Sequence, residues 1–268
     1  RNQGAEAGQD SGNLETHESQ LEASYEILLC KAERQLISAG VPDASLDAWY
    51  LLSDTFRISR ADYLWKKKSC PPVIPDCWQE RLDRRCRREP LAYIVGSTEF
   101  MGLSFRVGPE VLIPRQDTET LVEYALQRLR PGDRVLDLCT GSGCIGISLM
   151  KLGGARVWCA DISEKALAVA RSNGQRLGCD GISWIRSDLL EQIEEKAFDM
   201  IVSNPPYIPS EVIDGLMPEV RDHEPRLALD GDGDGLSFYR RLASDCKGFL
   251  KPGGLLCMEI GCDQGRAV

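Results

Sequence analysis

The chain has 268 residues, of which 43% are hydrophobic and 27% charged, and its formal net charge is −9. This length accommodates one large domain, or one large and one small, and no apolar run approaches the roughly 18 residues that span a bilayer. Two histidines, His17 and His223, are too few for most histidine metal sites or for Ser-His-Asp hydrolysis. The acidic balance argues against direct nucleic-acid binding, and 11 scattered cysteines without a C-x-x-C pair indicate reduced thiols in a cytoplasmic protein.

The N-terminal third of the chain is polar at first and then helical. Residues 1–18 lack periodicity, which predicts a disordered tail. Residues 19–89 place apolar side chains at helical spacing, so we expect a small helical domain with a role in substrate recognition. Residues 90–114 change to alternation and predict a β-hairpin linker, after which Asp117 is expected to cap a helix that ends near Leu129.

Strands and helices alternate from residue 115 to residue 268. The expected strands are 135–138, 157–160, 182–185, 200–203 and 254–260, and the expected helices are 145–152, 164–177 and 238–250. This alternation predicts an α/β domain with a parallel, doubly wound sheet. Ligands of such sheets bind at the carboxyl ends of the strands, where the loops after the first and fourth strands lie.

The turn Asn204-Pro205-Pro206-Tyr207 follows the fourth expected strand and is the most informative motif. Two prolines fix φ and remove two backbone donors, so the turn offers acceptors: the Asn204 side-chain oxygen and the Pro205 carbonyl oxygen. Tyr207 adds a flat ring. A planar NH2 group needs two acceptors and a cover for its plane, and we therefore expect Asn204, Pro205, Pro206 and Tyr207 to be catalytic.

The loop after the first expected strand reads Cys139-Thr140-Gly141-Ser142-Gly143-Cys144-Ile145-Gly146 and contains G-x-G-x-x-G. Asp161 ends the next strand and can accept both hydroxyls of a ribose. Taken alone, this pattern suits a dinucleotide.

Two further carboxylates favour S-adenosylmethionine over a nicotinamide dinucleotide. Asp137 suits a cationic sulfonium and amino group and would repel a pyrophosphate. Asp188 can accept an adenine amino group while Leu189 packs on the ring, although both aspartates can instead cap helices. The expected cofactor-binding residues are Asp137, Cys139, Thr140, Gly141, Ser142, Gly143, Asp161, Asp188, Leu189 and Asn204, and no metal is expected.

With these motifs, residues 20–268 resemble the HemK-type glutamine N5-methyltransferases of peptide chain release factors. The segments that separate this family from other Asn-Pro-Pro-Tyr enzymes are Ile113-Pro114-Arg115-Gln116-Asp117-Thr118-Glu119 and Glu224-Pro225-Arg226-Leu227-Ala228-Leu229-Asp230-Gly231. The resemblance implies a helical domain that meets the release factor, a hairpin linker, and a class I (Rossmann-like) methyltransferase domain. It also implies S-adenosylmethionine as donor and the glutamine of a Gly-Gly-Gln loop as acceptor, with consequences for translation termination.

Three departures from the family pattern stand out. Cys139 replaces a frequent Gly and Gln116 replaces a usual Pro. The family's sheet continues beyond the fifth strand, so we expect the chain ending at Val268 to be a truncated methyltransferase domain, with its C-terminal strands missing.

Three other functions stay open from the sequence. An adenine-amino DNA or RNA methyltransferase uses the same turn, because an exocyclic NH2 poses the same chemical problem. A methyltransferase-like binding module without activity is the second. A nicotinamide oxidoreductase is the third, but it gives the Asn-Pro-Pro-Tyr turn no purpose. The partners expected are release factors, with no membrane and no direct nucleic acid.

Overall fold

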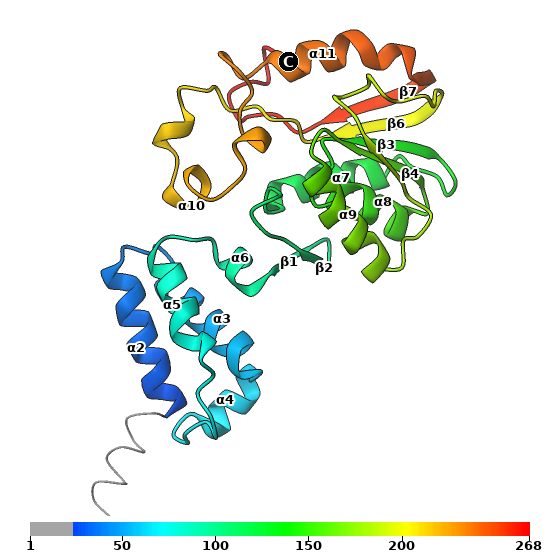
Figure 1. Ribbon diagram of the computed structural model, residues 1–268. Coiled ribbons are helices and arrows are strands. Elements are labelled where there is room, and N and C mark those ends of the chain that lie inside the picture. The colour runs from blue at the N-terminus through cyan, green and yellow to red at the C-terminus, as the bar shows by residue number, and fades with distance from the viewer. Residues whose placement is uncertain (1–23) are drawn as a thin grey trace, which may run out of the picture. The chain divides into compact units, whose positions relative to one another are not determined.

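A computed structural model describes residues 24–268 of the chain, so the tail expected at residues 1–18 lies outside the described part. The chain divides into two compact units, Arg1–Val95 and Gly96–Val268 (Figure 1). Each unit has its own hydrophobic core.

The first unit is a bundle of five helices in its described part. They are α2 (Tyr25–Ser38), α3 (Ala44–Phe56), α4 (Arg60–Lys66), α5 (Cys77–Cys86) and α6 (Leu91–Val95). Leu28, Ala32 and Leu36 recur at helical spacing and are buried, which explains why α2 packs as an amphipathic helix. The ion pair between Arg85 and Asp47, 2.7 Å, links α5 to α3 inside this bundle.

The hairpin of the second unit is shorter than the segment that suggested it. Strands β1 (Ser97–Phe100) and β2 (Leu103–Arg106) pair antiparallel, whereas residues 91–95 form α6 of the first unit. The short apolar run before Gly96 is compatible with either element, and Pro90 at its start suits the first turn of a helix. Phe100 and Phe105 pack edge to face and bury the hairpin on the core of the second unit.

The second unit is built on a parallel sheet in the order β5-β4-β3-β6-β7. Its strands are β3 (Arg134–Leu138), β4 (Arg156–Asp161), β5 (Ser183–Arg186), β6 (Phe198–Ser203) and β7 (Leu250–Met258). Its helices are α7 (Gln116–Leu126), α8 (Cys144–Gly153), α9 (Glu164–Arg176), α10 (Pro218–Arg221) and α11 (Ser237–Asp245), with short 3-10 turns η1 (Ile213–Gly215), η2 (Arg226–Ala228) and η3 (Cys246–Gly248). The doubly wound α/β fold and the N-terminal helical unit are thus confirmed.

Several element boundaries differ from the expectation. The helix expected to end near Leu129 ends at Leu126, and the helix expected at 238–250 ends at Asp245 and is followed by the 3-10 turn η3. Helix α7 starts at Gln116 with Arg115 at its cap position, so Asp117 lies in the first turn and does not cap the helix. Strand β7 starts at Leu250 instead of residue 254, because Phe198 pairs with Leu250 and an irregularity in register accommodates Gly253 and Gly254. The Pro252-Gly253-Gly254 run therefore lies in a bulge within the strand.

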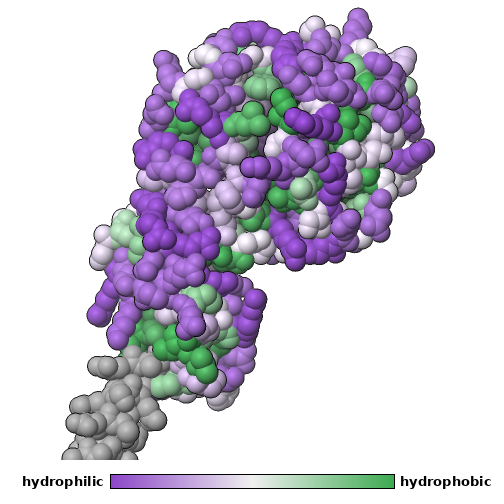
Figure 2. Space-filling view, viewed as in Figure 1, coloured by the Kyte–Doolittle hydropathy of each residue, from purple (hydrophilic) through white to green (hydrophobic). Residues whose placement is uncertain are grey.

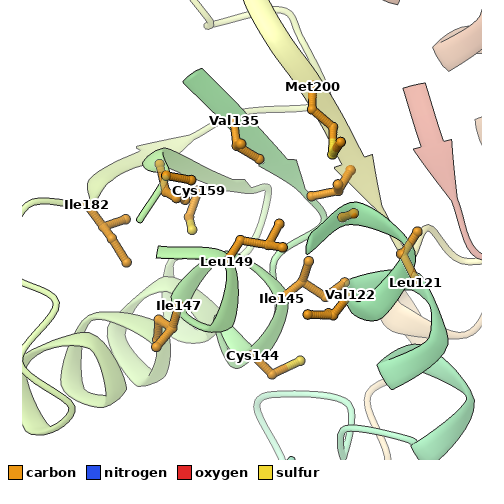
Figure 3. Packing of buried hydrophobic residues seen from close by; sticks show 14 of the residues in the cluster. Leu121, Val122, Val135, Cys144, Ile145, Ile147, Leu149, Cys159, Ile182 and Met200 are labelled. Carbon is orange, nitrogen blue, oxygen red and sulfur yellow. The ribbon is translucent and has the colours of Figure 1, made fainter. Parts of the chain in front are cut away.

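Both faces of the sheet are covered because alternate strand residues point to opposite sides. Val135, Cys159 and Met200 face the cluster that contains Ile145 and Leu149 of α8 (Figure 3). A second buried cluster lies on the other face and includes a residue of α11, Leu242. Its other members include Leu136, Trp158, Phe198 and Ile201. In Figure 1, α8 and α9 accordingly lie on one side of the strands and α11 on the other.

The face seen in Figure 2 is mainly hydrophilic, with separate hydrophobic patches. Leu64 and Trp65 of α4 and Val73 nearby in sequence are the most exposed of the large hydrophobic side chains. Across residues 24–268, no helix combines the length and the apolar character needed to cross a membrane.

Phe198 tests the packing of the sheet against α11. Its side chain is fully buried and packs edge to face on Trp158 at 5.3 Å. We expect Phe198→Ala to lower the free energy of unfolding by about 3–5 kcal/mol, because the substitution removes buried area and leaves a cavity. Urea unfolding followed by circular dichroism measures this change, with the half-exposed Leu152→Ala as control. A loss equal to that of the control would contradict this account of the core.

Candidate active site

A cavity opens at the carboxyl edge of the sheet, where the loops after β3, β4, β5 and β6 converge. Of the residues expected at the site, the ones that line it are Cys139, Thr140, Gly141, Ser142, Asp161, Asp188, Leu189, Asn204 and Pro206. Asp137, Gly143, Pro205 and Tyr207 do not line it. The other lining residues include Arg115 and Thr118 near the start of α7, Phe238 and Arg241 of α11, and Leu227 of η2.

The glycine loop directs its backbone donors into the protein. The N–H of Gly141 donates to Asp161 Oδ2 at 2.9 Å, that of Gly143 to the Thr140 carbonyl at 2.8 Å, and that of Gly146 to Asp137 Oδ2 at 2.9 Å. A phosphate-binding loop points such donors at its ligand instead. The G-x-G-x-x-G pattern therefore serves close packing here and forms no phosphate cradle with these three groups.

Close packing explains two of these glycines directly. A Cβ on Gly146 would stand 2.4 Å from Cys159 Sγ, and one on Gly143 would stand 2.9 Å from Ile147 Cδ1. A side chain at either position would therefore displace a neighbouring buried side chain, and the positive φ of 81° at Gly143 favours glycine as well.

Cys139 has a positive φ of 58°. That left-handed conformation explains why glycine suits the position. Burial and the nearby Asp161 raise the pKa of the Cys139 thiol well above its usual range. The thiol therefore stays protonated at neutral pH and contributes an uncharged wall to the cavity.

Asp137 supports the loop from beneath. Its side chain is fully buried, and Oδ2 accepts from Thr140 Oγ1 at 2.6 Å as well as from Gly146. Oδ1 has no hydrogen-bond partner among the described residues. Burial raises the pKa of this carboxyl to about 7, although the bonds from Thr140 and Gly146 oppose the shift. The expected contact of Asp137 with a cationic ligand stays a prediction, since the structure shows it bonded within the loop.

Asp161 and Asp188 present carboxylates to the cavity itself. Asp161 ends β4, and its two oxygens accept from the N–H groups of Gly141 and Ser163, both at 2.9 Å. Desolvation raises the pKa of Asp161 while these backbone bonds lower it. Asp188 Oδ1 accepts from Arg241 Nη2 at 2.8 Å. Arg241 belongs to no sequence motif, and the packing of α11 brings it to the carboxyl edge of the sheet.

The Asn204-Pro205-Pro206-Tyr207 turn begins where β6 ends. Asn204 Nδ2 donates to Oγ1 of the buried Thr118 at 3.4 Å, which leaves the Asn204 side-chain oxygen as an acceptor. The hydroxyl of Tyr207 donates to Glu259 Oε1 at 3.2 Å. Thr118 and Glu259 were not among the expected site residues, although Thr118 lies in the Ile-Pro-Arg segment and Glu259 lies within the last expected strand, residues 254–260.

The two segments that distinguish the family meet beside this turn. Arg115 forms an ion pair with Glu224, and Glu224 Oε2 also accepts from the N–H of Ile113 at 3.2 Å. Burial raises the pKa of the Glu224 carboxyl, and the Arg115 charge opposes that shift. The ion pair thus fastens the segment before α7 to the segment after the turn.

The acceptors and apolar side chains that line the cavity fit an organic ligand with hydroxyl groups, a flat ring and a positive charge. Asp161 and Asp188 supply acceptors and negative charge, whereas Ile162, Leu189 and Phe238 supply apolar surface. Within residues 24–268, no cluster of three or more His, Cys, Asp or Glu side chains has the arrangement of a metal site. S-adenosylmethionine matches this chemistry better than a pyrophosphate-bearing dinucleotide does.

Asp137 gives the stability of the protein a specific pH dependence. Its folded pKa of about 7 lies above the ~3.9 of an unfolded Asp. Between these values the folded chain holds a proton that the unfolded chain releases, so this group lowers the unfolding free energy as pH rises from about 4 to about 7. We expect Asp137→Asn to gain stability relative to the wild type across that interval, measured by urea unfolding at several pH values. Parallel curves for the two proteins would contradict the buried, proton-binding carboxyl.

Two family descriptions match the chain. Residues 28–96 match the PrmC N-terminal domain, and residues 116–217 match the Methyltransferase small domain. Together they cover the helical unit and most of the sheet that carries the cavity.

Curated relatives extend over nearly the whole chain. The release factor glutamine methyltransferase of Moorella thermoacetica is 44% identical over 246 residues, which cover 90% of this chain and 86% of the relative. That of Geobacter sulfurreducens is 43% identical and covers 87% of this chain and 82% of its own.

Among solved structures, the hMettl16 catalytic domain in complex with the MAT2A 3'UTR hairpin 1 has a TM-score of 0.53 and 19% identity. The match covers 81% of this chain and 78% of that one, and it supports the fold alone. Identity above 40% over most of both chains, with matching domains and the geometry above, establishes more than the fold: the chain belongs to the release factor glutamine methyltransferase family.

Proposed function

We propose that this enzyme transfers a methyl group from S-adenosylmethionine to the side-chain amide nitrogen (N5) of the glutamine in the Gly-Gly-Gln loop of peptide chain release factors. The observation that carries the proposal is the orientation of Asn204. This residue lines the cavity, and its amide nitrogen is engaged by Thr118, so its oxygen is the group that remains to accept from a substrate NH2.

The substrate amide needs two acceptors because its nitrogen carries two protons. Asn204 Oδ1 accepts one, and the Pro205 carbonyl accepts the other. The Tyr207 ring covers the amide plane. Neither Pro205 nor Pro206 has a backbone N–H, so the turn keeps its acceptors oriented outward without a competing local donor.

An amide nitrogen is a weak nucleophile because its lone pair is delocalised into the carbonyl. When bound, S-adenosylmethionine supplies an electrophilic methyl group on a sulfonium. The protein's contribution is alignment, which can lower an effective barrier by roughly 7–11 kcal/mol. Asp161 holds ribose hydroxyls, Asp188 accepts from the adenine amino group, and Leu189 packs on the adenine ring. Cys139, Thr140, Gly141 and Ser142 form the adjoining wall, and Gly143 and Asp137 support it from behind.

The helical unit, residues 24–95 of the described chain, is the proposed docking domain for the release factor. The net charge of −9 supports a protein partner and no direct contact with nucleic acid. All 11 cysteines are free thiols, which supports a reducing, cytoplasmic setting.

Mass spectrometry of a release factor after incubation with the enzyme and S-adenosylmethionine tests the function. We expect a gain of one methylene mass on the peptide that contains Gly-Gly-Gln, located on its glutamine by fragmentation. Parallel reactions with adenine-containing DNA and RNA oligonucleotides test the other substrate class. Methylated oligonucleotide with unmodified release factor would overturn the proposal.

Asn204→Ala removes one of the two proposed acceptors. We expect methyl transfer to fall below detection while S-adenosylmethionine still binds, because the Asp161 and Asp188 loops are unchanged. Mass spectrometry measures transfer and isothermal titration measures binding, with the exposed Glu194→Ala as a control that keeps both. Normal turnover by Asn204→Ala would remove Asn204 from the mechanism.

Asp161→Ala removes the proposed ribose acceptor and the anchor of the Gly141 N–H. Loss of a charged hydrogen bond costs roughly 1.5–3 kcal/mol, which corresponds to a dissociation constant about tenfold to 150-fold higher. Isothermal titration with S-adenosylmethionine measures this, and the exposed Asp245→Ala serves as the matched control. An unchanged dissociation constant would place the ribose elsewhere.

A further inference from the structure

Tyr207 is held by hydrogen bonds at both its backbone carbonyl and its side-chain hydroxyl. Its backbone carbonyl accepts from Gln264 Nε2 at 3.0 Å, and its hydroxyl donates to Glu259 Oε1 at 3.2 Å. Gly235 approaches its backbone so closely that a Cβ there would stand 2.4 Å from the Tyr207 carbonyl oxygen. The backbone contacts hold the main chain of Tyr207 in position, and the Glu259 contact holds the hydroxyl end of its ring.

Glu259 is itself placed by the sheet. It directly follows β7, and its N–H donates to the Ser203 carbonyl at 3.0 Å, which continues the pairing of β6 with β7. Its carbonyl accepts from the hydroxyl of the buried Tyr239 of α11 at 3.0 Å. Because Ser203 immediately precedes Asn204, Glu259 stands beside the start of the Asn-Pro-Pro-Tyr turn.

The carboxylate is an unusual choice for a purely architectural contact. Glu259 Oε2 is buried and has no hydrogen-bond partner among residues 24–268, and a buried polar atom without a partner is costly. A charged acceptor, however, makes a hydrogen bond about twice as strong as a neutral one. Burial and the Glu259 charge raise the pKa of the Tyr207 phenol to about 12, so the hydroxyl stays a donor at neutral pH.

We propose that Glu259 is a positioning residue for methyl transfer: by accepting from the Tyr207 hydroxyl, it holds the ring in the plane against which the substrate amide is aligned. This inference rests on the proposed function of the Asn-Pro-Pro-Tyr turn and adds a residue that lies outside that motif. Without the contact, the ring is free to rotate about the Cα–Cβ bond, while the acceptors Asn204 and Pro205 stay in place.

The test compares Glu259→Ala, Glu259→Gln, Tyr207→Phe and the double variant Tyr207→Phe/Glu259→Ala. We expect Glu259→Ala to lower kcat for the release factor by about tenfold to 100-fold, because misplacement by about 1 Å can cost that much. The dissociation constant of S-adenosylmethionine should stay unchanged. Glu259→Gln should recover part of the loss, since its amide oxygen still accepts from the phenol. The double variant should be no slower than the slower single variant, because both remove one contact.

Glu194→Ala is the matched surface control and should keep wild-type kcat. An unchanged kcat in Glu259→Ala would overturn the inference, as would losses that add in the double variant. Global unfolding is monitored by S-adenosylmethionine binding, which an unfolded variant would lose.

A second readout keeps this inference separable from the proposed function. In protein labelled with 13C at the tyrosine hydroxyl carbon, the resonance assigned through Tyr207→Phe should shift in Glu259→Ala. Absence of methylation by the wild type would overturn the function on release factors. Absence of the resonance shift would overturn the Glu259 contact, whatever the substrate.

Discussion

A turn with two successive prolines lacks the backbone N–H groups that would stabilise it internally, and the surrounding segments of the second unit supply the missing contacts. Pro205 and Pro206 donate no backbone hydrogen bond, so surrounding segments must fix the turn from outside. The N–H of Ile208 donates to the Leu229 carbonyl at 3.0 Å, and that of Gly231 returns to the Ile208 carbonyl at 2.8 Å. These bonds join the turn to the Glu-Pro-Arg segment, and the Arg115–Glu224 ion pair carries the connection to the start of α7.

Three acidic side chains with buried carboxyl oxygens hold the segments around the site in place. Asp137 holds the glycine loop, Glu224 joins two distant segments, and Glu259 contacts Tyr207. Two of these acids keep one oxygen without a hydrogen-bond partner in the described part of the chain. A carboxylate that accepts several N–H and O–H groups orders its neighbours strongly, but its desolvation costs stability. The site therefore combines a rigid geometry with an energetic cost that the two hydrophobic clusters around the sheet offset.

The sequence predicted the fold well because its signals are local. Strand and helix periods, the glycine loop and the Asn-Pro-Pro-Tyr turn are each contained in a few consecutive residues, and most of the expected lining residues do meet in one cavity. Contacts between distant segments were not predictable in the same way. Arg241 and Glu259 belong to no motif, and Thr118 lies in the Ile-Pro-Arg segment, which by itself assigns it no contact. The roles of these three residues depend on how α7, α11 and β7 pack. The sequence likewise does not show whether the Asp137 carboxyl points toward the ligand or, as in the structure, bonds to Thr140 and Gly146 of the loop.

The inward direction of the glycine-loop donors has a consequence for selectivity among metabolites. Adenosine is shared by many abundant cellular compounds, most of which carry phosphates. Gly141, Gly143 and Gly146 have already committed their N–H groups to acceptors within the protein, so a phosphate chain at this loop finds no backbone donor from these three glycines. The loop that packs tightly on the sheet thus lacks the backbone contacts by which other glycine-rich loops retain the phosphates of a nucleotide such as ATP.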